Sequence, residues 1–306
     1  MTTETDVYHA NTRIRETGVD RAFTIINYTL LTLFLLVILY PLIYVVSASF
    51  SDGAAVIAGR VWLWPVNPSL FAYEKVFSYP LIWSGYGNSL FYAVVGTLVN
   101  VTMTLIAAYP LSRRDLWGKN VILGLFLFTM FFNGGLIPTY LLVRDLGLRN
   151  TRWALIIPQA LSVWNLLIAI TFLRSSIPHE LLEASQLDGC SDLQYFFRVL
   201  LPLSTPLIAV MSLFYAIGHW NQFFAALLYL TDKDLFPLQI ILRNILISSQ
   251  VDMAMIEDIK IMAAREALRE LLKYALIVVA SVPVLIIYPF VQKYFVKGIM
   301  LGSVKG

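Results

Sequence analysis

The sequence predicts an all-α integral membrane protein with six transmembrane helices. Of its 306 residues, 58% are hydrophobic and 13% are charged, whereas soluble domains carry about 25% charged residues. Six runs of at least 19 residues contain no charged residue, and the next longest charge-free run has 13. About 20 apolar residues cross a hydrocarbon core of about 30 Å. Runs of this length pair their backbone groups internally as helices in lipid, so we expect one helical span from each.

The six expected spans divide the chain into a transmembrane domain and two tails. The charge-free runs are 22–51, 76–112, 120–143, 153–173, 199–231 and 274–292. The first run is far longer than the apolar core of a signal peptide, which has about 7 to 15 residues, so we expect it to remain as the first span. This predicts an N-terminal tail at 1–21, a transmembrane domain at 22–295 and a C-terminal tail at 296–306.

The segments between the spans leave the orientation of the chain open. The piece at 52–87 is rich in Trp, Tyr and Pro, as expected of a loop at a membrane interface. In the piece at 231–273, acidic and basic residues alternate over 258–273, and we expect this stretch to form a helix on the outer interface. Lysine and arginine residues divide equally between the two sides, 11 on each, so the positive-inside rule does not orient the chain.

Composition excludes several classes of partner and site. The net charge is only +3 and the basic residues are dispersed, so no nucleic-acid partner is expected. The chain has one cysteine and therefore no intramolecular disulfide. Residues 179–183 read H-E-L-L-E and lack the second histidine of a zinc-binding helix, so we expect no metal site. Membrane lipid is the partner that the composition predicts.

The energy for any transport must come from outside the chain. Gly118-Lys119 is followed by Asn120 and lacks the upstream glycine of a phosphate-binding loop, so we expect no ATP site. The six spans contain no Asp, Glu, Lys or Arg, the groups that carry protons or other coupling ions in many carriers. No internal repeat of the kind common in secondary transporters is visible.

The segment at 174–203, between the fourth and fifth spans, is predicted to form two short helices joined by a tight turn. Pro178 fits the first turn of the first helix, where no amide partner is lost. Gly189 can adopt the left-handed conformation that ends this helix. Ser191 and Gln194 have the spacing of a capping box at the start of the second helix. Such a pair forms a rigid knob on one side of the membrane.

The knob carries the residues of a known signature. Residues 183–189 read E-A-S-Q-L-D-G, and after nine further residues 199–202 read V-L-L-P. This pattern resembles the EAA signature of permease subunits of ATP-binding-cassette (ABC) importers, with Ser185 and Cys190 at positions where the family commonly has alanine. The stretches 214–224 and 292–306 resemble the carbohydrate branch, namely the oligosaccharide subgroup of the maltose-transporter-like permeases. The resemblance extends from the first span to the last residue.

The resemblance implies a complete assembly around this chain. It implies the type I ABC importer permease fold in the cytoplasmic (cell) membrane, with the 174–203 loop and both termini in the cytoplasm. The implied partners are a second permease subunit, a dimer of cytoplasmic ABC ATPases, and an extracellular or periplasmic sugar-binding protein. ATP and Mg²⁺ would be bound by the ATPase, so no cofactor is expected on this chain. The implied function is import of a carbohydrate, in particular an oligosaccharide.

The resemblance also assigns the contact with the ATPase. In the family this loop sits in a cleft of the ATPase and converts closure of the ATPase dimer into a swing of the permease helices. Acidic residues would anchor the loop in the cleft, and the L-P pair would fix the second helix to the fifth span. The residues assigned to coupling are Glu183, Ala184, Ser185, Asp188, Gly189, Leu201 and Pro202.

Five residues within the spans are candidates for a sugar path. Trp220 and Asn221 fit one, because an indole face stacks on a pyranose ring and an amide reads hydroxyl groups. Trp164-Asn165 repeats this pairing in the fourth span. His219 is the only histidine within a span, and its alternative role is a hydrogen bond between helices. A second alternative is that the partner permease makes most of the substrate contacts.

Two other functions remain as rivals at this stage. The first is an importer permease for a solute other than a sugar, such as a peptide or a polyamine. The second is a membrane-embedded enzyme. The enzyme is disfavoured because no span contains a paired carboxylate, a metal-ligand cluster or a Ser/His pair at a usable spacing.

Overall fold

The computed structural model describes residues 17–251 and 259–303, and within these ranges the chain forms helices, turns and loops with no strand. Helix α1 (Gly18–Ser49), helix α4 (Leu81–Ser112) and the part of helix α14 (Ile259–Ser303) at Arg265–Pro289 are each long and apolar enough to cross a membrane. They correspond to the first, second and last charge-free runs. Of the two expected tails, residues 1–16 and 304–306 lie outside the described residues, and 296–303 form the end of α14.

The three middle runs form bent pairs of helices rather than straight spans. The chain bends by 112° between helices α5 (Lys119–Phe131) and α6 (Leu136–Asp145). It bends by 50° between the short helices η1 (Arg152–Leu155) and η2 (Ile157–Gln159) and helix α7 (Val163–Ser176). It bends by 78° between the segment Asp192–Leu203 and α11 (Thr205–Asn221). The described residues therefore contain three helices that can span a membrane, or six spans if each bent pair counts as one.

The sharpest bend has a local cause in the sequence. Between α5 and α6 the chain reads Asn133-Gly134-Gly135, and the Asn133 carboxamide oxygen accepts a hydrogen bond from the Gly135 amide at 3.0 Å. This side chain replaces a helical backbone partner, as asparagine commonly does in turns. The expectation of one uninterrupted helix over 120–143 is therefore wrong.

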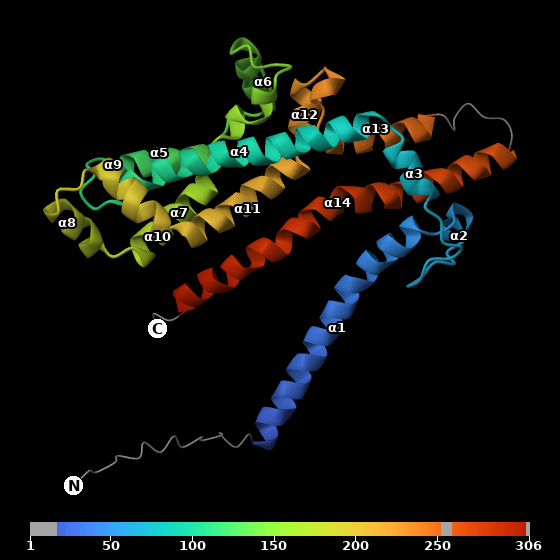
Figure 1. The fold of residues 1–306 in the computed structure, drawn as a ribbon, viewed down its shortest axis with the longest axis horizontal. Helices are drawn as coiled ribbons and strands as arrows, with labels where there is room; N and C mark the ends of the chain where they lie inside the picture. Colours follow the sequence, from blue (N-terminus) through green and yellow to red (C-terminus); the bar gives the residue numbers. More distant parts are fainter. Residues whose placement is uncertain (1–16, 252–258, 304–306) are drawn as a thin grey trace, which may run out of the picture.

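Helices α4, α7 and α11 form the centre of the bundle and run along its long axis (Figure 1). Their contact buries Leu105 and Ala108 of α4, Leu166 and Ile170 of α7, and Met211 of α11. Helix α14 lies along α11 and also contacts α13 (Leu238–Val251). Van der Waals contact of this kind, rather than exclusion of water, holds helices together inside a membrane.

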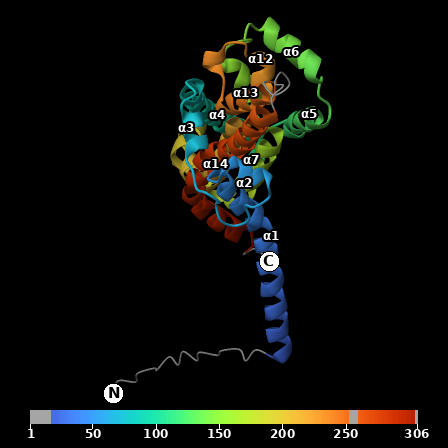
Figure 2. The same ribbon diagram turned by 90° about the vertical axis from the view of Figure 1, so that its right-hand side faces the viewer.

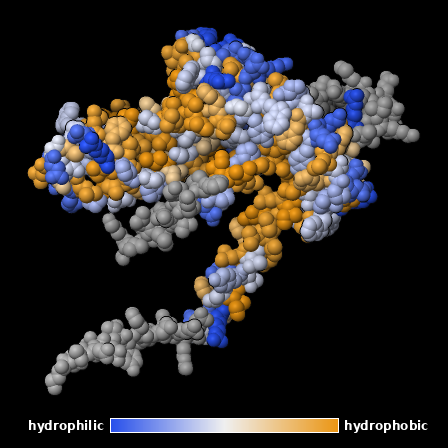
Figure 3. Space-filling view, viewed as in Figure 1, coloured by the Kyte–Doolittle hydropathy of each residue, from blue (hydrophilic) through white to orange (hydrophobic). Residues whose placement is uncertain are grey.

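Helix α1 extends away from this bundle as an arm (Figures 1 and 2). It is buried only at its last residues, Ser47 to Ser49, where it contacts α14. The rest of α1 exposes leucine, isoleucine, valine and phenylalanine side chains, seen as the hydrophobic surface of the arm in Figure 3. Such a surface is stable when lipid or another apolar surface covers it.

The two ends of the bundle carry different short elements. Helices α2 (Gly53–Ile57) and α3 (Phe71–Phe77) contact α14 at one end, and α8 (His179–Leu187) lies at the opposite end (Figure 1). Helices α6 and α12 (Phe224–Tyr229) project from one side of the bundle. The stretch expected to form an interfacial helix is helical from Ile259 onward, where it forms the first part of α14 and continues without a break into the apolar part of that helix.

Candidate coupling loop and polar cavity

The loop between α7 and α11 forms the two helices and the turn that the sequence predicts. The first helix, α8, ends where Gly189 has a φ of 77°, a left-handed conformation that glycine adopts without strain. The amide of Cys190 bonds to the carbonyl oxygen of Ser185 at 2.9 Å and closes this end. The predicted capping box is confirmed, because the Ser191 and Gln194 side chains each bond to the other's backbone amide, at 3.3 and 2.9 Å.

The second helix of the loop is short and irregular. Helix α9 (Asp192–Tyr195) continues into the π-helical turn η3 (Phe196–Leu200) and then into α10 (Leu201–Leu203). Pro202 lies in the first turn of α10, and the chain bends at Ser204 into α11. A π-helical turn inside a helix often marks a functional site. Because of the bend at Ser204, the second helix of the loop is not a straight extension of α11.

The residues assigned to coupling are displayed on the surface of α8 and the turn. Glu183, Ala184, Asp188 and Gly189 are exposed and Ser185 is partly exposed. Leu182 is instead buried and fixes α8 to the bundle. At the other end of the loop, Pro202 is exposed and Leu201 packs partly against the bundle core.

Two features of this surface were not singled out from the sequence. Leu187 and Leu193 flank the Gly189 turn, and their side chains are 90% and 71% exposed. The Glu183 carboxylate lies 3.1 Å from Nδ1 of His179, one helical turn earlier. The leucines have a signal in the sequence, because each stands directly between two polar residues, in Gln186-Leu187-Asp188 and Asp192-Leu193-Gln194. The loop thus offers a partner apolar side chains beside carboxylates.

A network of polar side chains connects α4, α11 and the bend before α7. Nε2 of His219 lies 2.6 Å from Oδ1 of Asn100, and the Asn100 amide nitrogen donates to the carbonyl oxygen of Gln159. One turn further along α4, the hydroxyl groups of Thr104 and Tyr215 are 2.8 Å apart. The His219–Asn100 bond connects two helices, which is the alternative role predicted for His219 from the sequence.

The network borders a cavity of about 390 Å³. It lies where the chain bends between η2 and α7, and its wall includes the side chains of Asn100, Asn165 and His219. Asn165 is 7% exposed and His219 is 3% exposed. Amide, imidazole and hydroxyl groups can together donate to and accept from a polyhydroxylated ligand.

The structure brings together only two of the five residues expected to line a sugar path, Asn165 and His219. The Trp220 indole is buried among α4, α13 and α14, and its N–H donates to the carbonyl oxygen of Ala280 at 3.0 Å. Trp164 is 61% exposed and lines a different hollow on α7. Asn221 is exposed at the end of α11.

Comparison with known proteins agrees with this architecture. Residues 100–301 match the family described as "Binding-protein-dependent transport system inner membrane component". The polygalacturonan/rhamnogalacturonan transport system permease protein YtcP of Bacillus subtilis (strain 168) is 44% identical over 288 residues, which cover 94% of this chain and 99% of YtcP. The arabinooligosaccharides transport system permease protein AraQ of Halalkalibacterium halodurans is 28% identical, over 87% of this chain and 91% of AraQ.

A solved structure extends the comparison to the fold. A chain from the crystal structure of a bacterial ABC transporter involved in the import of the acidic polysaccharide alginate superposes with a TM-score of 0.79. The two sequences are 37% identical, and the match covers 92% of this chain and 99% of that one. The chain therefore belongs to the family of binding-protein-dependent transport system inner membrane components, and it is a multi-pass membrane transport subunit rather than an enzyme.

Proposed function

We propose that this chain is one permease subunit of an ATP-driven ABC importer for an oligosaccharide. The observation that carries the proposal is the exposed helix pair at 179–203 with its E-A-S-x-x-D-G turn, in a chain whose relatives have names that specify sugar transport. The remainder of the importer would be a second permease, a dimer of ABC ATPases that binds ATP and Mg²⁺, and an external sugar-binding protein.

In this proposal each bent pair crosses the membrane once, so the chain has six spans. The 174–203 loop and both termini then lie in the cytoplasm, and the projection formed by α6 and α12 lies outside. One of the bends supports this arrangement, because irregular backbone inside a membrane is tolerated where it is buried in protein or lines a polar cavity. The bend between η2 and α7 borders such a cavity.

The loop would couple the permease to the ATPase. Glu183 and Asp188 would make polar contacts in the ATPase cleft, with Ala184 and Ser185 allowing a close approach. Gly189 holds the angle between the two helices. Leu201 and Pro202 would transmit movement of the loop to the bend at Ser204 and from there to α11. A stiff loop suits this role, because a lever must move as a rigid body.

The substrate path would pass the polar cavity, where His219 and Asn165 would face sugar hydroxyl groups. Asn221, exposed at the end of α11, would contribute at the mouth of the path. Trp164 would contribute only if the path included the hollow on its own face of α7. Trp220 would support α11 through its buried contacts and would not stack on a sugar in this conformation.

Substitution of Gly189 tests the coupling role. Valine at a φ of 77° costs about 1 to 2 kcal/mol, because its Cβ crowds the following carbonyl, whereas asparagine tolerates this conformation. Gly189→Val should insert normally, co-purify poorly with the ATPase and support little uptake, and Gly189→Asn should retain both. Glu183→Ala should be milder, since it removes one exposed contact. Normal uptake by Gly189→Val would contradict the coupling role.

The same assembled importer tests the substrate class. Uptake of labelled oligosaccharides, peptides and polyamines is compared in proteoliposomes containing the chain, its partner permease, the ATPase and the binding protein. Oligosaccharide uptake that depends on ATP supports the proposal. Uptake of a peptide or polyamine without uptake of any sugar would refute it.

A further inference from the structure

Arg113, the first residue after α4, links the end of that helix to the loop at 174–203. Its Nη1 atom lies 2.5 Å from Oδ1 of Asp192, the first residue of α9, and 3.2 Å from the Tyr109 hydroxyl oxygen. Asp192 is 79 positions away in the sequence. The Arg113 side chain is only 15% exposed, although it lies in a loop.

The guanidinium group is held in place from its other side. Nε and Nη2 of Arg113 bond to the two carboxylate oxygens of Asp115 at 2.8 and 2.6 Å. This two-point contact fixes the plane of the guanidinium and directs Nη1 at Asp192. The contact also holds the pKa of Asp115 below its usual value. Only arginine presents donors on both edges of one planar group, so lysine cannot make the same three contacts.

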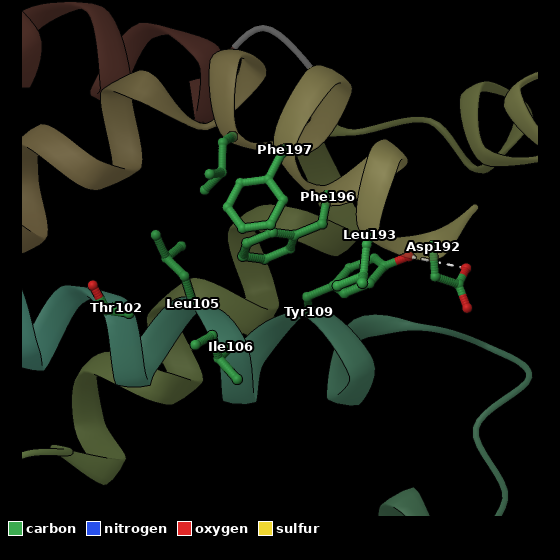
Figure 4. Close-up of a pocket in the computed structure, with 9 residues that line it drawn as sticks. Thr102, Leu105, Ile106, Tyr109, Asp192, Leu193, Phe196 and Phe197 are labelled. Atoms are coloured by element: carbon green, nitrogen blue, oxygen red, sulfur yellow. Dashed lines mark hydrogen bonds between the residues drawn. The ribbon is translucent and has the colours of Figure 1, made fainter. Parts of the chain in front are cut away.

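Aromatic side chains next to these ion pairs also connect α4 to the second helix of the loop. The Tyr109 ring of α4 lies 6.1 Å from the Tyr195 ring and 5.5 Å from the Phe196 ring, measured between ring centres. Its hydroxyl lies 3.5 Å from Oδ1 of Asp192, the dashed line in Figure 4. Figure 4 shows Tyr109 on α4 and Leu193 and Phe196 on the loop. The three residues line a pocket of about 380 Å³.

The second helix of the loop is thus attached to α4 by side chains, and the chain continues from it into α11 through a bend. The chain bends by 78° between the segment Asp192–Leu203 and α11, and the π-helical turn lies between Asp192 and that bend. If the backbone were the only connection, movement of the loop would change the bend before α11 without moving α11 itself. The contacts with α4 connect the loop directly to the bundle, so that movement of the loop also moves α4.

We propose that Arg113 is a positioning residue that locks the 174–203 loop to α4, so that movement of the loop moves α4 and α11 together. This inference rests on the proposed function. Without the lock, the ATPase would still dock on α8 and hydrolyse ATP, but the loop would move against α4. The expected result is fewer sugar molecules imported for each ATP hydrolysed.

The test measures uptake and ATP hydrolysis together in proteoliposomes containing the complete importer. Arg113→Gln should lower the ratio of uptake to hydrolysis by about threefold to fivefold, the scale expected for loss of an ion pair whose Asp192 side chain is 62% exposed. Arg113→Lys should give only partial function. The matched control is Arg144→Gln, because the Arg144–Asp145 pair is exposed and joins neighbouring residues of α6. It should leave the ratio unchanged.

A charge swap separates positioning from a merely structural role. Asp192→Arg alone should uncouple the importer, and combining it with Arg113→Asp should restore much of the ratio. A structural role would instead lower the amount of assembled complex and leave the ratio at the wild-type value. If Arg113→Gln does not assemble, Asp192→Asn is measured instead, because it leaves the contact of Arg113 with Asp115 in place.

Gly189→Val, measured in parallel, distinguishes two kinds of failure. If Gly189→Val abolishes coupled uptake while Arg113→Gln and Asp192→Asn keep the wild-type ratio, this inference is wrong and the proposed function stands. If Gly189→Val also transports normally, the coupling role of the whole loop is wrong.

Discussion

Nε2 of His219 in α11 lies 2.6 Å from Oδ1 of Asn100 in α4, and the two residues are 3% and 1% exposed. The Asn100 amide nitrogen donates to the Gln159 carbonyl oxygen, so its Oδ1 faces the imidazole and His219 donates through Nε2–H. One asparagine therefore joins the second and fifth expected spans to the bend at the start of the fourth. Asn100, Gln159 and His219 also line the cavity, so this polar tie forms part of its wall.

Loss of this donor should destabilise the protein. His219→Leu leaves the buried Asn100 oxygen without a partner, which costs about 1 to 2 kcal/mol inside a membrane protein. The measurement is the thermal unfolding midpoint in detergent. The control is Gly218→Ala on the same helix, where an added Cβ meets no atom within 4 Å. An unchanged midpoint for His219→Leu would show that the tie does not stabilise the bundle.

Gly96 of α4 should not tolerate a side chain, because the His219 ring lies directly against it. A Cβ at Gly96 would overlap the His219 ring, whereas a Cβ at Gly87 on the same helix would meet open space. Gly96→Ala should therefore cost about 2 kcal/mol through overpacking, and Gly87→Ala should be neutral or slightly stabilising. Both are measured by thermal unfolding and by ATP-dependent uptake. Equal behaviour of the two variants would refute the close approach of α4 and α11.

Local signals in the sequence were sufficient to locate the apolar helices and to predict the turn of the loop. The charge-free runs located the apolar helices because length and hydropathy are local properties. Gly189 and the Ser191–Gln194 capping box predicted the turn because each acts within a few residues. The bend at Asn133-Gly134-Gly135 also has a local signal, but the long apolar run around it favoured a single span.

Contacts between distant segments could not be predicted in this way. Trp220 was one candidate for stacking on a sugar, and its sequence position gave no sign that its indole donates to the carbonyl oxygen of Ala280, 60 positions later. Arg113 and its partner Asp192 lie in different loops, 79 positions apart in the sequence. Hydropathy shows that a helix is apolar, but it does not show which face meets which neighbour.

The proposed orientation can be measured with the chain's own thiol. Cys190 is the only cysteine, it is partly exposed, and it lies next to the Gly189 turn. A membrane-impermeant maleimide should label Cys190 in inverted vesicles and not in intact cells. The control is Lys233→Cys in a Cys190→Ser background, placed in η4 (Lys233–Leu235) and expected to label from outside. The opposite pattern would refute a cytoplasmic loop.

Cross-linking from Cys190 tests the central claim, that this loop is the docking site of the ATPase, most directly. A short thiol-to-amine cross-linker is attached to Cys190 in membranes that contain the complete importer, with Cys190→Ser as the control. The account predicts a covalent product with the ATPase subunit, reduced in Gly189→Val and absent from the control. A product with the external binding protein, or no ATPase product from an importer that transports normally, would contradict it.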